Sequence, residues 1–221
     1  MADVRDLDSV KGVAFKVADL LEAGHRELAL TLVAGRANLS RCIEEPIVNR
    51  PGLALTGFYD HFAWKRLQIL GHAETAYLRS LDDSTRLQRL RALLDHDACL
   101  FVCTNGVDPL PDEVALFEQS RAVLLKTPLL TRDFARQASF VLGRLGAPQT
   151  QLYATMVEVN GIGVLFEGAP GLGKSETALG LIKRGHALVS DDLTCIRRGL
   201  GSKILFASAS EANTTRPSQL G

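Results

Sequence analysis

Gly168-Ala-Pro-Gly-Leu-Gly-Lys-Ser175 matches the phosphate-binding pattern G-x-x-x-x-G-K-[ST] at every fixed position. Before it, the apolar run 162–166 suits a buried strand. After it, residues 175–182 carry apolar side chains at helical spacing, with a stop near Gly185. In a strand–loop–helix unit, glycines let successive backbone N–H groups converge on phosphate oxygens at the positive end of the helix. The stretch predicts a nucleotide or phosphate site rather than an ordinary glycine-rich turn.

The loop also supplies the candidate ligand-binding side chains. In this pattern the lysine reaches the outer phosphates, and the hydroxyl that follows it ligates magnesium. We therefore expect Lys174 to contact phosphate and Ser175 to be a metal ligand. The expected binding residues are Gly168, Ala169, Pro170, Gly171, Leu172, Gly173, Lys174 and Ser175.

Two adjacent acids, Asp191 and Asp192, end a short apolar run that follows the loop helix. Carboxylates at a strand end lie at the carboxyl edge of a sheet, where α/β proteins bind ligands. One acid can hold magnesium through water, and the other can accept a proton from an attacking hydroxyl. The alternative is a solvated strand end that carries acids by chance. The position of the pair, one helix and one strand after the loop, favours the functional interpretation.

Composition limits the other function classes. The 221 residues are 46% hydrophobic and 23% charged, which is enough for the core of one or two domains. Lys plus Arg and Asp plus Glu both number 25, so no nucleic-acid or membrane-binding surface is expected. Cys99 and Cys103 lie in an apolar segment and are expected to be buried free thiols. Without a signal-peptide pattern or an apolar run of about 18 residues, the sequence predicts a cytoplasmic protein.

The order of elements predicts an α/β fold with two domains. Strands alternate with helices through the first part of the chain, which favours a parallel or mixed sheet. Residues 146–150 are rich in breakers and form the expected linker between an N-terminal α/β domain, 1–145, and a second domain, 151–221. The second domain opens with a predicted hairpin, because Asn160-Gly161 separates two apolar runs. The expected elements of the first domain are helices at 17–24, 85–94, 111–120 and 131–145, and strands at 28–33, 42–48, 67–71, 98–103 and 122–125.

The chain resembles the HPr kinase/phosphorylase family from about residue 14 to about residue 208. The loop continues as Ser-Glu-Thr-Ala-Leu179 and is followed by Lys183-Arg-Gly-His-Ala-Leu-Val-Ser-Asp-Asp192. In the N-terminal half, Asn49-Arg-Pro-Gly-Leu-Ala-Leu-Thr-Gly-Phe58 and Leu67-Gln-Ile-Leu-Gly-His-Ala-Glu74 also match. The loop alone is generic, whereas its combination with Lys-Arg-Gly-His and Asp-Asp at this spacing is specific.

The resemblance implies a bifunctional enzyme. Such an enzyme phosphorylates a seryl group of the phosphocarrier HPr with ATP or pyrophosphate and Mg²⁺. It also removes that phosphoryl group by phosphorolysis, which consumes phosphate and yields pyrophosphate. The resemblance also implies a P-loop kinase domain with a phosphoenolpyruvate-carboxykinase-like core, and a hexamer. By motif position, the catalytic residues would be Lys174, Asp191 and Asp192, with Asp192 as the proton acceptor.

The sequence departs from the family pattern at two places. Tyr153 stands where the family usually has a catalytic histidine, and a phenol of ordinary pKa about 10 does not replace imidazole near neutrality. After Ser208 the family's acidic, glycine-rich stretch and its catalytic arginine have no match, so the C-terminal part of the kinase domain is expected to be missing. The alternative hypothesis is a nucleotide-binding regulatory module that has lost phosphotransfer.

Overall fold

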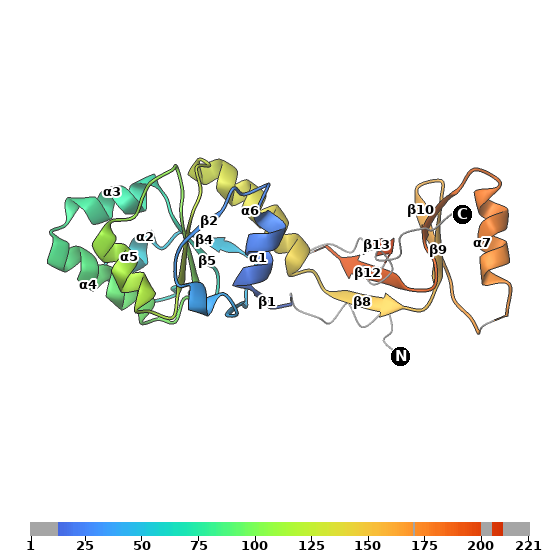
Figure 1. Ribbon diagram of the computed structural model, residues 1–221, viewed down its shortest axis with the longest axis horizontal. Coiled ribbons are helices and arrows are strands. Elements are labelled where there is room, and N and C mark those ends of the chain that lie inside the picture. The colour runs from blue at the N-terminus through green and yellow to red at the C-terminus, as the bar shows by residue number, and fades with distance from the viewer. Residues whose placement is uncertain (1–12, 170, 200–204, 210–221) are drawn as a thin grey trace, which may run out of the picture. The chain divides into compact units, whose positions relative to one another are not determined.

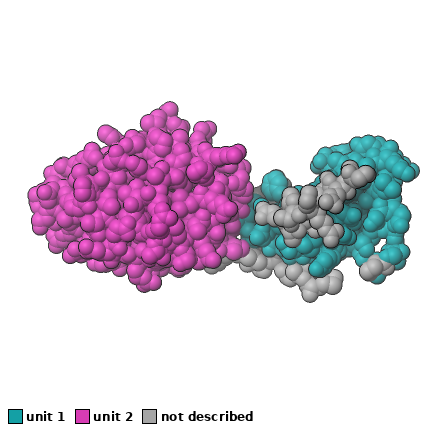
Figure 2. All heavy atoms as spheres, viewed as in Figure 1, with its two compact units in different colours: residues 1–11, 147–221 teal, residues 12–146 magenta. Residues whose placement is uncertain are grey.

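The computed structural model describes residues 13–169, 171–199 and 205–209. The chain divides into two compact units (Figure 2), which we call the N-terminal unit, residues 12–146, and the phosphate-loop unit, residues 1–11 and 147–221. Both contain strands and helices, so the predicted α/β class is confirmed.

A five-stranded sheet with strand order β2-β7-β6-β5-β4 forms the centre of the N-terminal unit (Figure 1). All neighbouring strands are parallel except β2, which pairs antiparallel with β7. The strands are β2 (Thr31–Ala34), β4 (Val48–Asn49), β5 (Leu67–Leu70), β6 (Leu100–Cys103) and β7 (Val123–Lys126). A two-residue pair, β1 (Phe15–Lys16) with β3 (Cys42–Ile43), stands outside this sheet.

Helices cover both faces of this sheet (Figure 1). On β6, Leu100 and Val102 belong to the cluster that α1 and α6 cover, and Phe101 and Cys103 belong to the opposite cluster. All four side chains are buried, as expected for a parallel strand with helices on either side. The first face packs against α1 (Val17–Gly24) and α6 (Thr131–Leu145), and the second against α2 (Gly52–Leu55), α3 (His72–Ser80), α4 (Asp83–Leu94) and α5 (Pro111–Glu118).

The structure corrects three local predictions in this unit. The expected strand 42–48 is interrupted and becomes β3 and β4, because Pro46 has no N–H to donate to a ladder. The strand expected at 28–33 lies at Thr31–Ala34. A threonine at the start of an apolar periodic segment predicts that Thr131 is the N-cap of α6, but it is the first helical residue, and its N–H donates to Asn105 Oδ1 at 3.1 Å. That capping side chain comes from the loop after β6, which local sequence does not reveal.

The phosphate-loop unit contains two three-stranded sheets, β10-β9-β11 and β13-β12-β8. The predicted hairpin is confirmed: Asn160 and Gly161 have φ of 52° and 79°, both positive as a type I′ turn requires. Helix α7 packs against β9 and β11. The elements are β8 (Gln149–Leu152), β9 (Thr155–Val159), β10 (Ile162–Phe166), α7 (Lys174–Ile182), β11 (Ala187–Ser190), β12 (Thr194–Arg198) and β13 (Leu205–Ala209).

The segment between the units differs from the predicted linker in one respect. Gln149 and Thr150 are not irregular but form the first half of β8, where they pair with Arg197 and Ile196 of β12. The division into units falls between Gly146 and Ala147.

Gly35 tests the packing of the N-terminal unit. Its φ is +80°, and a Cβ there would lie 2.2 Å from the carbonyl oxygen of Ala122. Gly106 has a similar φ of +65°, but its Cβ would meet nothing closer than 4.0 Å. We expect Gly106→Ala to cost about 1–2 kcal/mol of unfolding free energy, from backbone strain alone. Gly35→Ala should cost about 3 kcal/mol or more, because a clash with backbone adds to the strain. Urea unfolding of both variants measures the difference, and equal midpoints would contradict the predicted clash.

Candidate functional site: the phosphate loop and the acid pair

The topology of one small sheet brings the predicted site residues together. Strand β9 pairs antiparallel with β10 on one side and with β11 on the other, so β10 and β11 run in the same direction. Phe166, the last residue of β10, pairs with Thr155, and Ser190, the last residue of β11, pairs with Met156. The loop after β10 and the acid pair after β11 therefore leave the same edge of the sheet. This edge is where α/β sheets bind their ligands.

The loop has the backbone that its glycines predict. Gly168, Gly171 and Gly173 have φ of 153°, 86° and 78°, a region that residues with a Cβ rarely adopt. Gly173 is the residue that precedes the first turn of the nine-residue helix α7. The N-terminus of α7 therefore opens onto the loop, as an anion site requires. Pro170 lies outside the described residues.

Lys174 and Ser175 begin α7, and the two differ in their surroundings. The Lys174 ammonium turns back over the loop and donates to the carbonyl oxygens of Gly168 at 2.7 Å and Ala169 at 3.0 Å. The ammonium therefore lies over the turn that would hold a phosphate. When a phosphate binds there, the ammonium could donate to its oxygens in place of these two carbonyl oxygens. Ser175 is exposed in the first turn of α7.

The two acids are held differently. Asp191 Oδ1 accepts hydrogen bonds from the Thr155 hydroxyl at 2.7 Å and from the Asp192 backbone N–H at 3.1 Å. Asp192 has a left-handed φ of 65°, which an aspartate tolerates better than most residues with a Cβ. Both residues are exposed, so their carboxylates can reach a ligand at the sheet edge.

Buried hydroxyls stabilise residues 191–193, the turn between β11 and β12 that carries the two aspartates and that we call the acid turn. Thr194 Oγ1 donates to the Ala154 carbonyl oxygen at 2.7 Å, which uses its one proton. The 2.6 Å contact between Ser190 Oγ and Thr194 Oγ1 must then have Ser190 as its donor. The turn from β11 to β12 is thereby attached to the segment that joins β8 to β9. Sequence reasoning missed this support, although hydroxyl residues directly before and two residues after the acid pair were a usable signal.

Tyr153 lies at the same edge, two residues before Thr155. Its side chain is 84% exposed. An exposed phenol can donate a hydrogen bond to a ligand.

The side-chain oxygen atoms at this edge are suitable ligands for a magnesium ion that also binds phosphate. Ser175 and the two aspartates offer only oxygen atoms, the ligand type that Mg²⁺ prefers. Over the part of the chain that the structure describes, no group of three or more His, Cys, Asp and Glu side chains could hold a metal ion. A magnesium ion here would therefore take phosphate oxygens and water to complete its shell, as it commonly does in sites of phosphate transfer.

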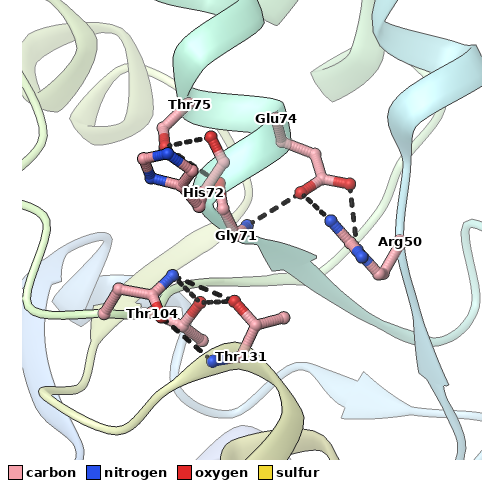
Figure 3. A network of polar contacts seen from close by, with 8 residues as sticks. Arg50, Gly71, His72, Glu74, Thr75, Thr104 and Thr131 are labelled. Atoms are coloured by element: carbon pink, nitrogen blue, oxygen red, sulfur yellow. Dashed lines mark hydrogen bonds and ion pairs between the residues drawn. The ribbon is translucent and has the colours of Figure 1, made fainter.

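A second polar cluster lies in the N-terminal unit, at the carboxyl ends of its parallel strands (Figure 3). Arg50 forms a bidentate ion pair with Glu74, at 3.1 and 2.9 Å, and Glu74 also accepts the Gly71 N–H at 3.1 Å. Thr104 and Thr131 share a hydrogen bond of 2.8 Å. These bonds join the ends of neighbouring strands and helices to one another, so the cluster fits a structural role.

Two further observations concern the rest of the described chain. Cys99 and Cys103 are buried and free, as predicted, and burial raises their thiol pKa values to about 11 and about 12. Such thiols stay protonated near neutral pH and are poor nucleophiles. Over the same residues, the helices are all too short or too polar to cross a membrane.

Comparisons with known proteins identify the family of this chain. Residues 15–142 match the family model described as HPr Serine kinase N terminus, and residues 145–215 match HPr Serine kinase C-terminal domain. The HPr kinase/phosphorylase of Leptospira biflexa is 42% identical over 85% of this chain and 58% of its own length. Those of Peptoclostridium acidaminophilum and Geobacter sulfurreducens are 38% and 33% identical, over 78% and 90% of this chain and 56% and 63% of theirs.

The chain spans a little under two thirds of the length of these curated relatives. Family models nonetheless cover nearly all of it, on both sides of the boundary between its two units. The second match includes the phosphate loop and the acid pair, which leave the same edge of one sheet. The chain belongs to the HPr serine kinase family.

Proposed function

We propose that this protein transfers the γ-phosphoryl group of ATP to a seryl hydroxyl of HPr, and that it removes this group by phosphorolysis. One observation carries the proposal: a phosphate loop and two carboxylates leave the same edge of one sheet, on either side of β9. The relatives named HPr kinase/phosphorylase support the choice of HPr as the substrate. They lend no support to a regulatory module without phosphotransfer.

The loop supplies the phosphate side of the reaction. Backbone N–H groups of 171–175, at the N-terminus of α7, would hold the outer phosphates. Lys174 would move from the carbonyl oxygens of Gly168 and Ala169 to a phosphate oxygen. Ser175 would hold magnesium, which neutralises charge on the transferred group. Because phosphoryl transfer needs little covalent help from the protein, positioning and charge stabilisation account for most of this contribution.

The acid pair supplies the acceptor side. A seryl hydroxyl is a poor nucleophile near neutral pH, so a carboxylate must accept its proton as the bond to phosphorus forms. We assign this task to Asp192 and the contact with magnesium to Asp191. In the reverse direction Asp192 would return the proton to the serine. The wider expectations from the family, a phosphoenolpyruvate-carboxykinase-like core, a hexamer and a cytoplasmic location, form part of the same proposal.

Lys174 tests the loop. Lys174→Ala should weaken ATP binding about 10- to 100-fold, since a hydrogen bond to a charged group contributes about 1.5–3 kcal/mol. Lys183→Ala is the matched control, because Lys183 is an exposed lysine at the opposite end of α7. Equilibrium titration with a fluorescent ATP analogue and Mg²⁺ measures both affinities. Equal affinities of wild type and Lys174→Ala would show that the loop assignment is wrong.

Paired asparagine variants test the acids. Asp192→Asn keeps the shape of the side chain but removes its proton affinity, so kcat should fall about 10²- to 10⁴-fold. ATP affinity should change little, because it depends on the loop. Asp191→Asn should instead raise the concentration of Mg²⁺ needed for half-maximal rate.

The measurement for this pair is transfer of labelled phosphate from ATP to HPr. If Asp191→Asn loses the rate while Asp192→Asn keeps it, the two roles are reversed. If wild type binds ATP with Mg²⁺ but transfers nothing to HPr, the proposed function is wrong.

A further inference from the structure

Thr155 differs from Thr127 and Thr194, two other buried threonines, in the group to which its hydroxyl donates. It is 2% exposed and donates to the carboxylate of Asp191 at 2.7 Å. Thr194 and Thr127 are equally buried, but their hydroxyls donate to backbone carbonyl oxygens, those of Ala154 and Leu28, each at 2.7 Å. The bond from Thr155 is therefore directed at a side chain that the proposed function uses. Strand propensity alone would not require a threonine hydroxyl to bond to a carboxylate.

This bond determines how the Asp191 carboxylate is oriented. Among the described residues, the Thr155 hydroxyl and the Asp192 N–H both donate to the same oxygen, Oδ1. Two donors on Oδ1 fix the rotation of the Asp191 side chain. The other oxygen, Oδ2, is then left for a different partner. Hydrogen bonds to an ionised acceptor are also stronger than neutral ones. An exposed aspartate in a turn would otherwise exchange rotamers on the nanosecond scale.

Thr155 also joins the two halves of the site. It is the first residue of β9 and pairs with Phe166, the residue at which β10 gives way to the phosphate loop. One buried residue thus contacts the loop strand through its backbone and the acid turn through its side chain. A shift of the hydroxyl would move Asp191 relative to the loop.

We propose that Thr155 is a positioning residue: its hydroxyl holds the Asp191 carboxylate in one orientation at the sheet edge, facing the ligand of the phosphate loop. This inference deepens the proposed function and rests on it for the role of Asp191 in phosphate transfer. The hydroxyl itself touches neither phosphate nor serine. Its loss should therefore change the rate of transfer and leave nucleotide binding nearly intact.

The first test needs no catalytic activity. Thr155→Val keeps the branched shape and removes the donor, and Thr155→Ser keeps the donor. NMR of the full chain reports on the amide proton of Asp192, which shares the acceptor with Thr155. In Thr155→Val that proton should exchange with water roughly five- to tenfold faster, since about one net hydrogen bond is lost. Thr155→Ser should restore the wild-type rate, and unchanged exchange in Thr155→Val would overturn the inference.

The second test measures transfer of labelled phosphate to HPr. Thr155→Val should raise the Mg²⁺ concentration needed for half-maximal rate, as Asp191→Asn should, and so lower kcat at a fixed Mg²⁺ concentration about 10- to 100-fold, the usual effect of removing a group that orients a ligating side chain. It should change KM for ATP less than about twofold. Thr155→Ser should recover most of kcat. Thr127→Val is the control for losing one buried hydroxyl bond, and it should lower the thermal midpoint without lowering kcat. If Thr155→Val is poorly folded, Thr155→Ala carries the same predictions.

The two tests separate this inference from the proposed function. An active wild type whose Thr155→Val variant keeps full kcat would overturn the positioning role. A wild type that transfers nothing, with the expected change at the Asp192 amide, would overturn phosphotransfer to HPr and leave the orienting contact in place.

Discussion

The pairing of β9 with a strand on each side is the constraint on which the candidate site depends. Because both pairs are antiparallel, β10 and β11 run parallel and end at one edge. A phosphate loop and an acid pair that are separated by a helix and a strand thereby face the same space. Neither segment could form the site alone, since the loop offers donors and positive charge while the turn offers carboxylates.

Buried hydroxyls help to fix the arrangement of that edge. Among the described residues of the phosphate-loop unit, the buried apolar side chains are mostly small, and both extended apolar clusters lie in the N-terminal unit. Thr155, Ser190 and Thr194 are almost fully buried beside the acid turn, and each has a hydrogen-bond partner there. A buried hydroxyl that lost its partner would cost about 1–3 kcal/mol, so these bonds specify one arrangement of the turn.

The N-terminal unit is stabilised differently, by apolar packing on both faces of its sheet. Its parallel strands are covered on both faces, and its polar residues at the strand ends form hydrogen bonds with one another. Arg50 and Glu74 lie within segments that carry the family resemblance, yet their contacts explain them as structural residues (Figure 3). Sequence similarity at such positions therefore indicates a shared fold as well as a shared function.

The sequence by itself determined the features that depend on neighbouring residues: the phosphate loop with its flanking strand and helix, the Asn160-Gly161 hairpin, the apolar strand 100–103 and the family. These follow from turn chemistry and periodicity, which act over a few residues. The sequence also held the reason why the strand predicted at 42–48 is interrupted, because Pro46 cannot donate to a ladder. Only the tertiary structure decided two bonds, the one by which Asn105 caps α6 and the one by which Thr155 holds Asp191. Each of these two bonds joins residues more than 25 positions apart, and strand pairing sets such partners without leaving a local pattern in the sequence.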